Sequence, residues 1–149
     1  MDSPNKNIIV IVLAAIVVLS AALFLTFRMQ ASKIPAVATW HNTTSDTITI
    51  TAPQPGQTIG KQFHVTGAAR GSWYFEASFP VHVFDKNGNI LIQKPAEALS
   101  NWMTTDFVQF DVALDVSTYT GPATVVLKKD NPSGDPSKDA SVEIPVLIK

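Results

Sequence analysis

The feature that most constrains the fold of this chain is a long, unbroken apolar run near its N-terminus. Ile8 to Phe27 reads IIVIVLAAIVVLSAALFLTF and contains no charged residue, no proline and no glycine. Because an α-helix rises about 1.5 Å per residue, a helix over this run is about 30 Å long, which matches the hydrocarbon thickness of a bilayer. A helix that is apolar on every side is typical of a membrane span. The sequence therefore predicts one transmembrane helix over residues 8–27, after a short tail of residues 1–7.

The main alternative to an anchor is a secretory signal peptide that is removed from the mature protein. The apolar part of such a peptide is normally about 7–15 residues long, which is shorter than this run. Ala36-Val37-Ala38 has the small residues of a cleavage site, but it lies well beyond Phe27, with Arg28 and Lys33 between them. We therefore favour the anchor over the cleaved peptide.

The charges that flank the apolar run give almost no information on its orientation. Lys6 lies on one side, and Arg28 and Lys33 lie on the other. We expect a single pass with the C-terminal domain outside the cytoplasm, because the N-terminal tail is short and the chain that follows is rich in β pattern.

Composition excludes several kinds of site and partner. The chain has no cysteine, so it has no disulfide, thiolate metal site, cysteine nucleophile or lipid-modified cysteine. The formal net charge of -1 gives no basic footprint for nucleic acid, and we expect no nucleic-acid partner. Residues 28–46 are rich in small and polar residues without a period, which predicts a stalk or linker. Residues 47–149 remain as one domain of ordinary size.

From Thr47 onward, apolar and polar residues alternate in short segments separated by turn residues. Val108, Phe110, Val112 and Leu114 alternate with polar or small residues. Asn87-Gly88, between two such segments, is a strong hairpin signal. Several short alternating strands with regular turns predict an all-β, immunoglobulin-like antiparallel β-sandwich.

One aromatic segment of this pattern has a predicted orientation of its own. The alternation places Trp73, Phe75, Ala77 and Phe79 on one face of a strand, where the aromatic side chains fill the core. Tyr74 then falls on the opposite, exposed face.

Several motifs, in order, give the domain a resemblance to a known family. They are Thr51-Ala52-Pro53-Gln54-Pro55-Gly56, Val65-Thr66-Gly67-Ala68-Ala69, Trp73-Tyr74-Phe75-Glu76-Ala77-Ser78-Phe79-Pro80-Val81, Trp102-Met103-Thr104, Phe107-Val108-Gln109-Phe110 and Lys129-Asp130-Asn131-Pro132-Ser133-Gly134. Together they resemble the bacterial spore germination immunoglobulin-like domain family over residues 46–149. The resemblance implies a sandwich domain of a bacterial envelope protein, and it supplies no catalytic residue. This chain has no partner domain and no lipobox, so the resemblance favours an envelope role more than a germination role.

The candidate recognition surface combines the exposed tyrosine with one polar loop. Its residues are Tyr74, Asp130, Asn131, Ser133 and Asp135. The loop is rich in oxygen atoms that could bind calcium, but it lacks the spacing and the terminal glutamate of an EF-hand. Asn-Pro and Ser-Gly are turn dipeptides, so a turn-forming loop explains the segment without a metal.

The ionisable residues give only a weak case for catalysis. Glu76 lies in an apolar segment, where we expect an ion pair with Arg70, Lys128 or Lys129. A glycosidase-like reaction needs a second acid, for which Asp106 is the nearest candidate. His41, His64 and His82 show no metal-ligand spacing. We therefore predict no catalytic residue, no cofactor and no metal.

These features together predict a non-enzymatic binding or scaffolding module, anchored in the bacterial cell membrane by one helix. Its expected partner is another envelope protein or a cell-wall glycan. Two alternatives remain open. One is a small hydrolase of envelope polymer that uses Glu76 and Asp106, and the other is an accessory subunit that pairs through its transmembrane helix.

Overall fold

Alternating side chains form short strands throughout the part of the chain that the computed structural model describes, residues 34–149. The strands are β1 (Thr39–His41), β2 (Ile48–Ala52), β3 (Thr58–Ile59), β4 (Gln62–Arg70), β5 (Ser78–Asp85), β6 (Ile90–Ala98), β7 (Phe107–Asp115), β8 (Gly121–Lys128) and β9 (Ser141–Ile148). Two short 3-10 helices, η1 (Gly71–Trp73) and η2 (Pro136–Lys138), interrupt them. The predicted all-β fold is confirmed for these residues.

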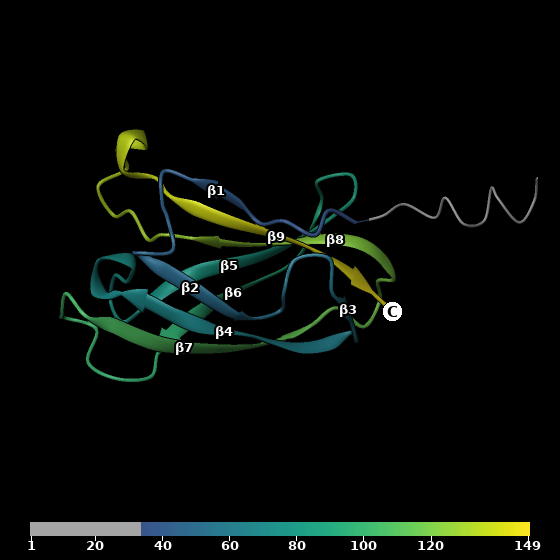
Figure 1. Ribbon diagram of the computed structural model, residues 1–149, viewed down its shortest axis with the longest axis horizontal. Helices are drawn as coiled ribbons and strands as arrows, with labels where there is room; N and C mark the ends of the chain where they lie inside the picture. Colours follow the sequence, from purple (N-terminus) through teal and green to yellow (C-terminus); the bar gives the residue numbers. More distant parts are fainter. Residues whose placement is uncertain (1–33) are drawn as a thin grey trace, which may run out of the picture. The chain divides into compact units, whose positions relative to one another are not determined.

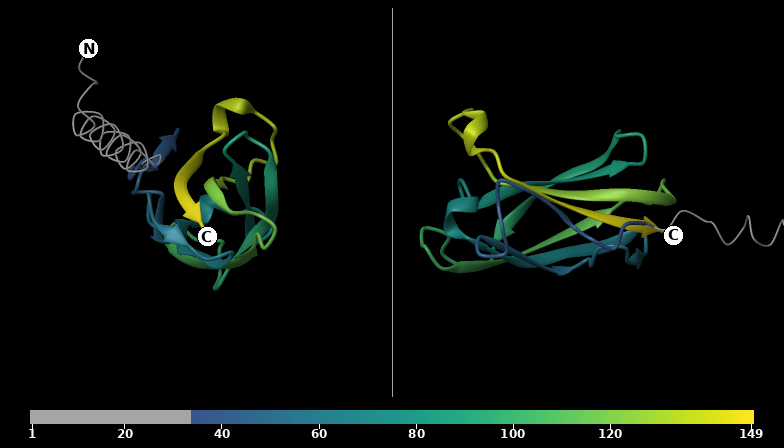
Figure 2. Two further views of the ribbon diagram at one scale, coloured as in Figure 1. Left: turned by 90° about the vertical axis from the view of Figure 1, so that its right-hand side faces the viewer. Right: turned by 45° about the horizontal axis from the view of Figure 1, so that its top comes forward.

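The strands form one strongly curled sheet in the order β1-β9-β8-β5-β6-β7-β4-β2, with β3 beside β9. All neighbours are antiparallel except β3 and β9, which are parallel. Strands β6 and β7 pair only at Glu97↔Asp111 and Ala98↔Phe110, so the sheet bends there into two layers. Figure 1 shows β1, β9 and β8 on one side and β2, β4 and β7 on the other, and the end-on view of Figure 2 shows the curl.

The core lies between the two layers and is built from the inward side chains of each strand. On β7, every second residue is buried from Val108 to Leu114, as the alternation predicts. The ring of Phe79, 0% exposed, makes edge contacts with three aromatic neighbours. Its ring centroid lies 5.7 Å from that of Trp73, 5.1 Å from that of Tyr74 and 5.0 Å from that of Phe110. These contacts link η1, β5 and β7.

The predicted hairpin at Asn87-Gly88 is also confirmed. Strands β5 and β6 are antiparallel on either side of it. Gly88 has a φ of 84°, a value that glycine adopts without steric cost. The Asp85 carboxylate accepts hydrogen bonds from the backbone N–H groups of Asn87 and Asn89, at 2.7 and 2.9 Å. The turn is therefore fixed by its own side chains.

The prediction of a single strand through Trp73–Phe79 is wrong. Residues Glu76 and Ala77 have φ values of 49° and 64°, and Phe75 and Ser78 exchange backbone hydrogen bonds of 3.0 and 3.1 Å across them. Two central residues with positive φ are typical of a tight hairpin turn. The helical turn η1 and this hairpin break the period-two pattern, so Tyr74 is buried and Phe75 is 42% exposed.

The predictions for the N-terminal part of the chain concern residues both outside and inside the range that the structure describes. The predicted tail 1–7, the transmembrane helix 8–27 and the first part of the linker 28–46 lie outside the described residues. Within the linker, Thr39–His41 form β1, which pairs with Ser141–Glu143 of β9. A strand of three residues is too short to show a period, which is why the alternation of apolar and polar residues does not reveal it. Residues 34–149 contain no helix with the length and apolarity of a membrane span.

Candidate functional site

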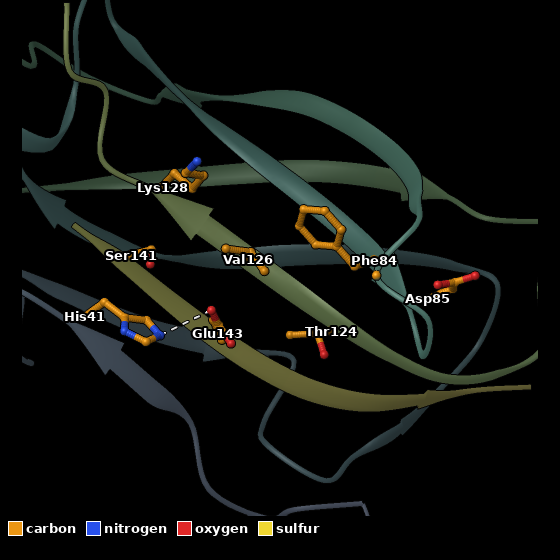
Figure 3. A pocket seen from close by; sticks show the side chains of 9 residues that line it. His41, Phe84, Asp85, Thr124, Val126, Lys128, Ser141 and Glu143 are labelled. Carbon is orange, nitrogen blue, oxygen red and sulfur yellow. Dashed lines mark ion pairs between the residues drawn. The ribbon is translucent and has the colours of Figure 1, made fainter. Parts of the chain in front are cut away.

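One candidate site is a shallow, open hollow on the outer face of the layer that contains β1, β9, β8 and β5. Its volume is about 530 Å³. Figure 3 shows its lining side chains, which come from four strands and the β5–β6 turn. They are His41, Phe84, Asp85, Gly88, Thr124, Val126, Lys128, Ser141 and Glu143.

The strand register places these side chains next to one another. Val83, Val125 and Ile144 point into the core, so their sequence neighbours point outward. Across the strands, Phe84 lies opposite Thr124. Further pairs bring Val126 opposite Glu143, and Lys128 opposite Ser141. The hollow therefore forms because strands that lie far apart in the sequence pair side by side in the sheet.

The floor of the hollow is apolar although it faces outward. It is formed by Phe84 on β5 and Val126 on β8, and Val126 is only 8% exposed. The ring of Phe84 is tilted against the imidazole of His82, with the centroids 5.8 Å apart. An aromatic and an aliphatic side chain here offer a flat surface for the apolar part of a ligand.

Charged and polar groups form the rim of the hollow. The Nε2 atom of His41 lies 3.2 Å from Oε1 of Glu143, and both side chains remain about half exposed. Hydrogen bonds from the side chain and backbone of Asn89, and from Asn87, hold the pKa of Asp85 below its usual value. Lys128 is exposed. The rim therefore presents fixed carboxylates, one ammonium group and an imidazole around an apolar floor.

A second, smaller hollow lies on the same outer face, at the other end of β5. Its volume is about 320 Å³, and it is lined by Ser78, Phe79, Pro80, Gln93, Lys94, Pro95 and Asp130. The half-buried His82 stands on β5 between the two hollows, opposite Gln93 of β6 and Val126 of β8. Its Nδ1 atom is buried and has no hydrogen-bond partner among the described residues.

The environment of His82 favours its neutral form. Burial lowers the pKa of His82, the Gln93 side chain opposes this in part, and the positive charge of Lys128 adds to it. An uncharged imidazole in the middle of the face can donate or accept a hydrogen bond without attracting ions.

The expectation that Tyr74 lies on an exposed face is corrected by the structure. Its side chain is 4% exposed, and its hydroxyl donates a hydrogen bond of 2.8 Å to the carbonyl oxygen of Val108. Burial raises the pKa of Tyr74 to about 12. The side chain faces inward because the turn after it changes the direction of the chain.

The polar loop is organised by its own hydrogen bonds. Asn131 Nδ2 donates to the carbonyl oxygen of Asp135 and to Oδ1 of Asp139, at 2.8 and 2.7 Å. The Ser133 hydroxyl donates to Oδ1 of Asn131 at 2.6 Å, and Asp135 accepts from the backbone N–H of Ser137, which caps η2. Asp130 lines the smaller hollow, while none of the four loop residues lines the larger one. Among residues 34–149, no group of three or more metal-binding side chains gathers.

The two acids proposed for hydrolysis lie in different loops. Glu76 is in the tight turn before β5, and Asp106 immediately precedes β7. Within the described chain Glu76 makes no ion pair, so the expected pair with a lysine or Arg70 is not present. The Arg70 guanidinium instead lies 4.2 Å from the centre of the Phe107 ring. Neither acid lines the larger hollow.

The residues of the larger hollow were missed at the level of sequence. One local signal was present, since Val125-Val126-Leu127 places an apolar residue at an outward position of β8. The pairing of His41 with Glu143 had no such signal, because the two residues lie in different strands far apart in the sequence.

The fold defines this protein as an immunoglobulin-like β domain. The profile of the family described as immunoglobulin-like domain of bacterial spore germination matches residues 47–135. The chain belongs to this family, as the motifs in the sequence indicate. No curated protein matches the chain.

Proposed function

We propose that this protein is a non-enzymatic binding or scaffolding module of the bacterial cell envelope, and that the outer face of β1, β9, β8 and β5 takes its ligand. One observation carries the proposal. The larger hollow combines an outward apolar floor of Phe84 and Val126 with a rim of hydrogen-bonding and charged groups. Apolar surface with a few placed polar groups is the usual composition of a binding site.

The rigidity of this face supports the same function. Strands β5 and β8 are paired on both sides, and β9 is paired with β8 and β1. The lining side chains therefore stand on a fixed scaffold, so a ligand meets groups that are already in place. The Asp85 carboxylate is held in the same way by the three hydrogen bonds of its turn.

The location in the envelope rests on the sequence and the family. The apolar run Ile8–Phe27 supports a single-pass anchor, and family membership supports a bacterial envelope setting. With the domain outside the cytoplasm, its available partners are envelope proteins and the cell-wall glycan. Protease added to intact cells should remove the domain, whereas complete protection would contradict this orientation.

The binding function is tested by retention of the detergent-solubilised full-length protein on isolated cell-wall sacculi. We expect retention, with loss on Phe84→Ala. Phe75→Ala is the matched control, because Phe75 is 42% exposed and lies in the turn before β5, outside the larger hollow. Retention that both variants keep would contradict a role of this face. No retention at all would redirect the search to an envelope protein, by cross-linking in the native membrane.

A further inference from the structure

The two hollows lie at opposite ends of one path, which is the outward face of β5. Ser78, Pro80, His82 and Phe84 all face outward on this strand, since Phe79, Val81 and Val83 between them are fully buried. The path runs from the smaller hollow at Ser78 and Pro80, past His82, to the larger hollow at Phe84. At about 3.3 Å per residue it is about 20 Å long, which suits a chain molecule better than a single small ligand.

The backbone beneath this path is already engaged. Strand β5 pairs with β6 on one side and with β8 on the other. An extended peptide therefore cannot add to the sheet here as a further strand, because strand addition needs a free edge. A ligand on this path is held by side chains alone.

The side chains along the path suit a molecule with apolar ring faces and polar edges. Pro80, Pro95, Phe84 and Val126 give flat apolar surface without hydrogen-bonding groups. Between and around them stand hydrogen-bonding side chains of several strands. These are Gln93, His82, Thr124, Ser141 and Asp85.

The charges on the path nearly cancel. The larger hollow has the carboxylates of Asp85 and Glu143 against the ammonium group of Lys128, and the smaller hollow has Asp130 against Lys94, so the carboxylates exceed the ammonium groups by one. Lys94 also donates a hydrogen bond of 3.1 Å to the carbonyl oxygen of Ala113, so its ammonium group is partly occupied. A surface without a dominant sign of charge does not favour a polyanion or a polycation.

We infer that the path along β5 binds an uncharged oligosaccharide. One sugar ring lies on Phe84 and another on Pro80, and His82 links these two subsites. This inference rests on the proposed function and names the ligand class of the same face. It assigns the wall glycan, rather than an envelope protein, as the partner.

The test uses the full-length protein in a detergent without a sugar headgroup, titrated calorimetrically with N-acetylglucosamine oligomers of increasing length. We expect affinity to rise with length until both hollows are filled. Phe84→Ala should weaken binding of every oligomer about tenfold, the usual effect of an aromatic stacking contact. His82→Ala should weaken the longer oligomers and leave the shortest unchanged. Phe75→Ala should leave all affinities unchanged.

Absence of binding by every oligomer would overturn the inference, as would binding that Phe84→Ala leaves intact. Preference for an anionic wall polymer, with affinity that falls steeply as salt is added, would also overturn it. If sacculi still retain the protein through Phe84 while neutral oligomers do not bind, the proposed function stands and the ligand class is wrong. If sacculi and oligomers both fail to bind, the glycan is excluded as the ligand, and the proposed function then depends on cross-linking to an envelope protein in the native membrane.

Discussion

The buried hydroxyl of Tyr74 makes the stability of the domain depend on pH in a way that one substitution can reverse. In Tyr74→Phe the ring stays in its contact with Phe79, at a centroid distance of 5.1 Å. The variant loses the hydrogen bond of 2.8 Å to the carbonyl oxygen of Val108, together with the backbone contact of the hydroxyl with Ala69. At neutral pH we expect it to be less stable by about 1 kcal/mol, the usual net value of such a bond.

At alkaline pH the same residue destabilises the folded state. Burial raises the pKa of Tyr74 from 10.0 to about 12, so the unfolded chain loses its proton first as the pH rises. The stability that depends on this proton is complete below pH 10 and is lost between pH 10 and about 12. At about 1.36 kcal/mol per pH unit, the loss over that interval is about 2.7 kcal/mol. Wild type and Tyr74→Phe should therefore have equal stability at about pH 11, and above this pH the variant should be the more stable of the two.

The assay is urea unfolding at neutral pH and at several alkaline pH values, followed by tryptophan fluorescence. Tyr119→Phe is the control, because the Tyr119 hydroxyl also donates to a backbone oxygen, that of Pro122, at 2.6 Å. This control should weaken the domain at neutral pH and keep the alkaline loss that Tyr74 causes. Parallel stability curves for wild type and Tyr74→Phe across pH 10 to 12 would refute the reasoning.

Three further substitutions, one of them with a matched control, test other features of the fold by urea or thermal unfolding. Gly71→Ala should destabilise by about 1–3 kcal/mol, because the new Cβ would lie 2.0 Å from the carbonyl oxygen of Thr104. Gly60→Ala, whose nearest contact is at 3.7 Å, should cost much less, and equal losses would contradict the steric argument. In the wild type, burial lowers the folded pKa of His82, so the unfolded chain takes up the proton first and the domain loses stability as the pH falls below 6.5. His82→Gln should remove this loss, and an unchanged dependence of stability on pH in this range would contradict the reasoning. Ala77→Gly should stabilise by up to about 1 kcal/mol, since its φ of 64° is costly for alanine, and a lower melting temperature would show that the turn is not strained.

The sequence was a reliable guide where one strand alternates without interruption. On β7 the buried residues Val108, Phe110, Val112 and Leu114 follow the pattern residue by residue, because β4 pairs with the whole of this strand without a register shift. The hairpin at Asn87-Gly88 was equally visible, since its turn needs a residue that adopts positive φ readily. Local rules sufficed in both cases.

The same rules failed between Trp73 and Phe79 for a definite physical reason. A tight turn with two positive φ values normally contains glycine or asparagine, and here Glu76 and Ala77 occupy it. The close approach of the Thr104 carbonyl to Gly71 also gives no signal in the sequence. With the turn hidden, the face of Tyr74 was assigned incorrectly.

The candidate site could not be predicted because a sheet surface depends on lateral register, which single-strand patterns do not contain. His41 reaches Glu143 only because the short strand β1 pairs with β9. A departure from the pattern was nevertheless present in the strands themselves. Strands β5 and β8 already bury Val83 and Val125 on their inner side, and yet they carry Phe84 and Val126 on the outer side.

An outward apolar residue on a solvated sheet face adds nothing to the core and lowers solubility. Positions that break a local rule without a structural benefit are expected at functional sites. Phe84 meets this condition, because it is half-buried against His82 instead of taking part in the core. The three polar contacts that fix Asp85 beside it keep a carboxylate at the edge of this apolar floor. The Asp85 carboxylate serves the turn as well, but the apolar floor beside it adds nothing to the core and is of use to a ligand, which is why we place recognition on this face.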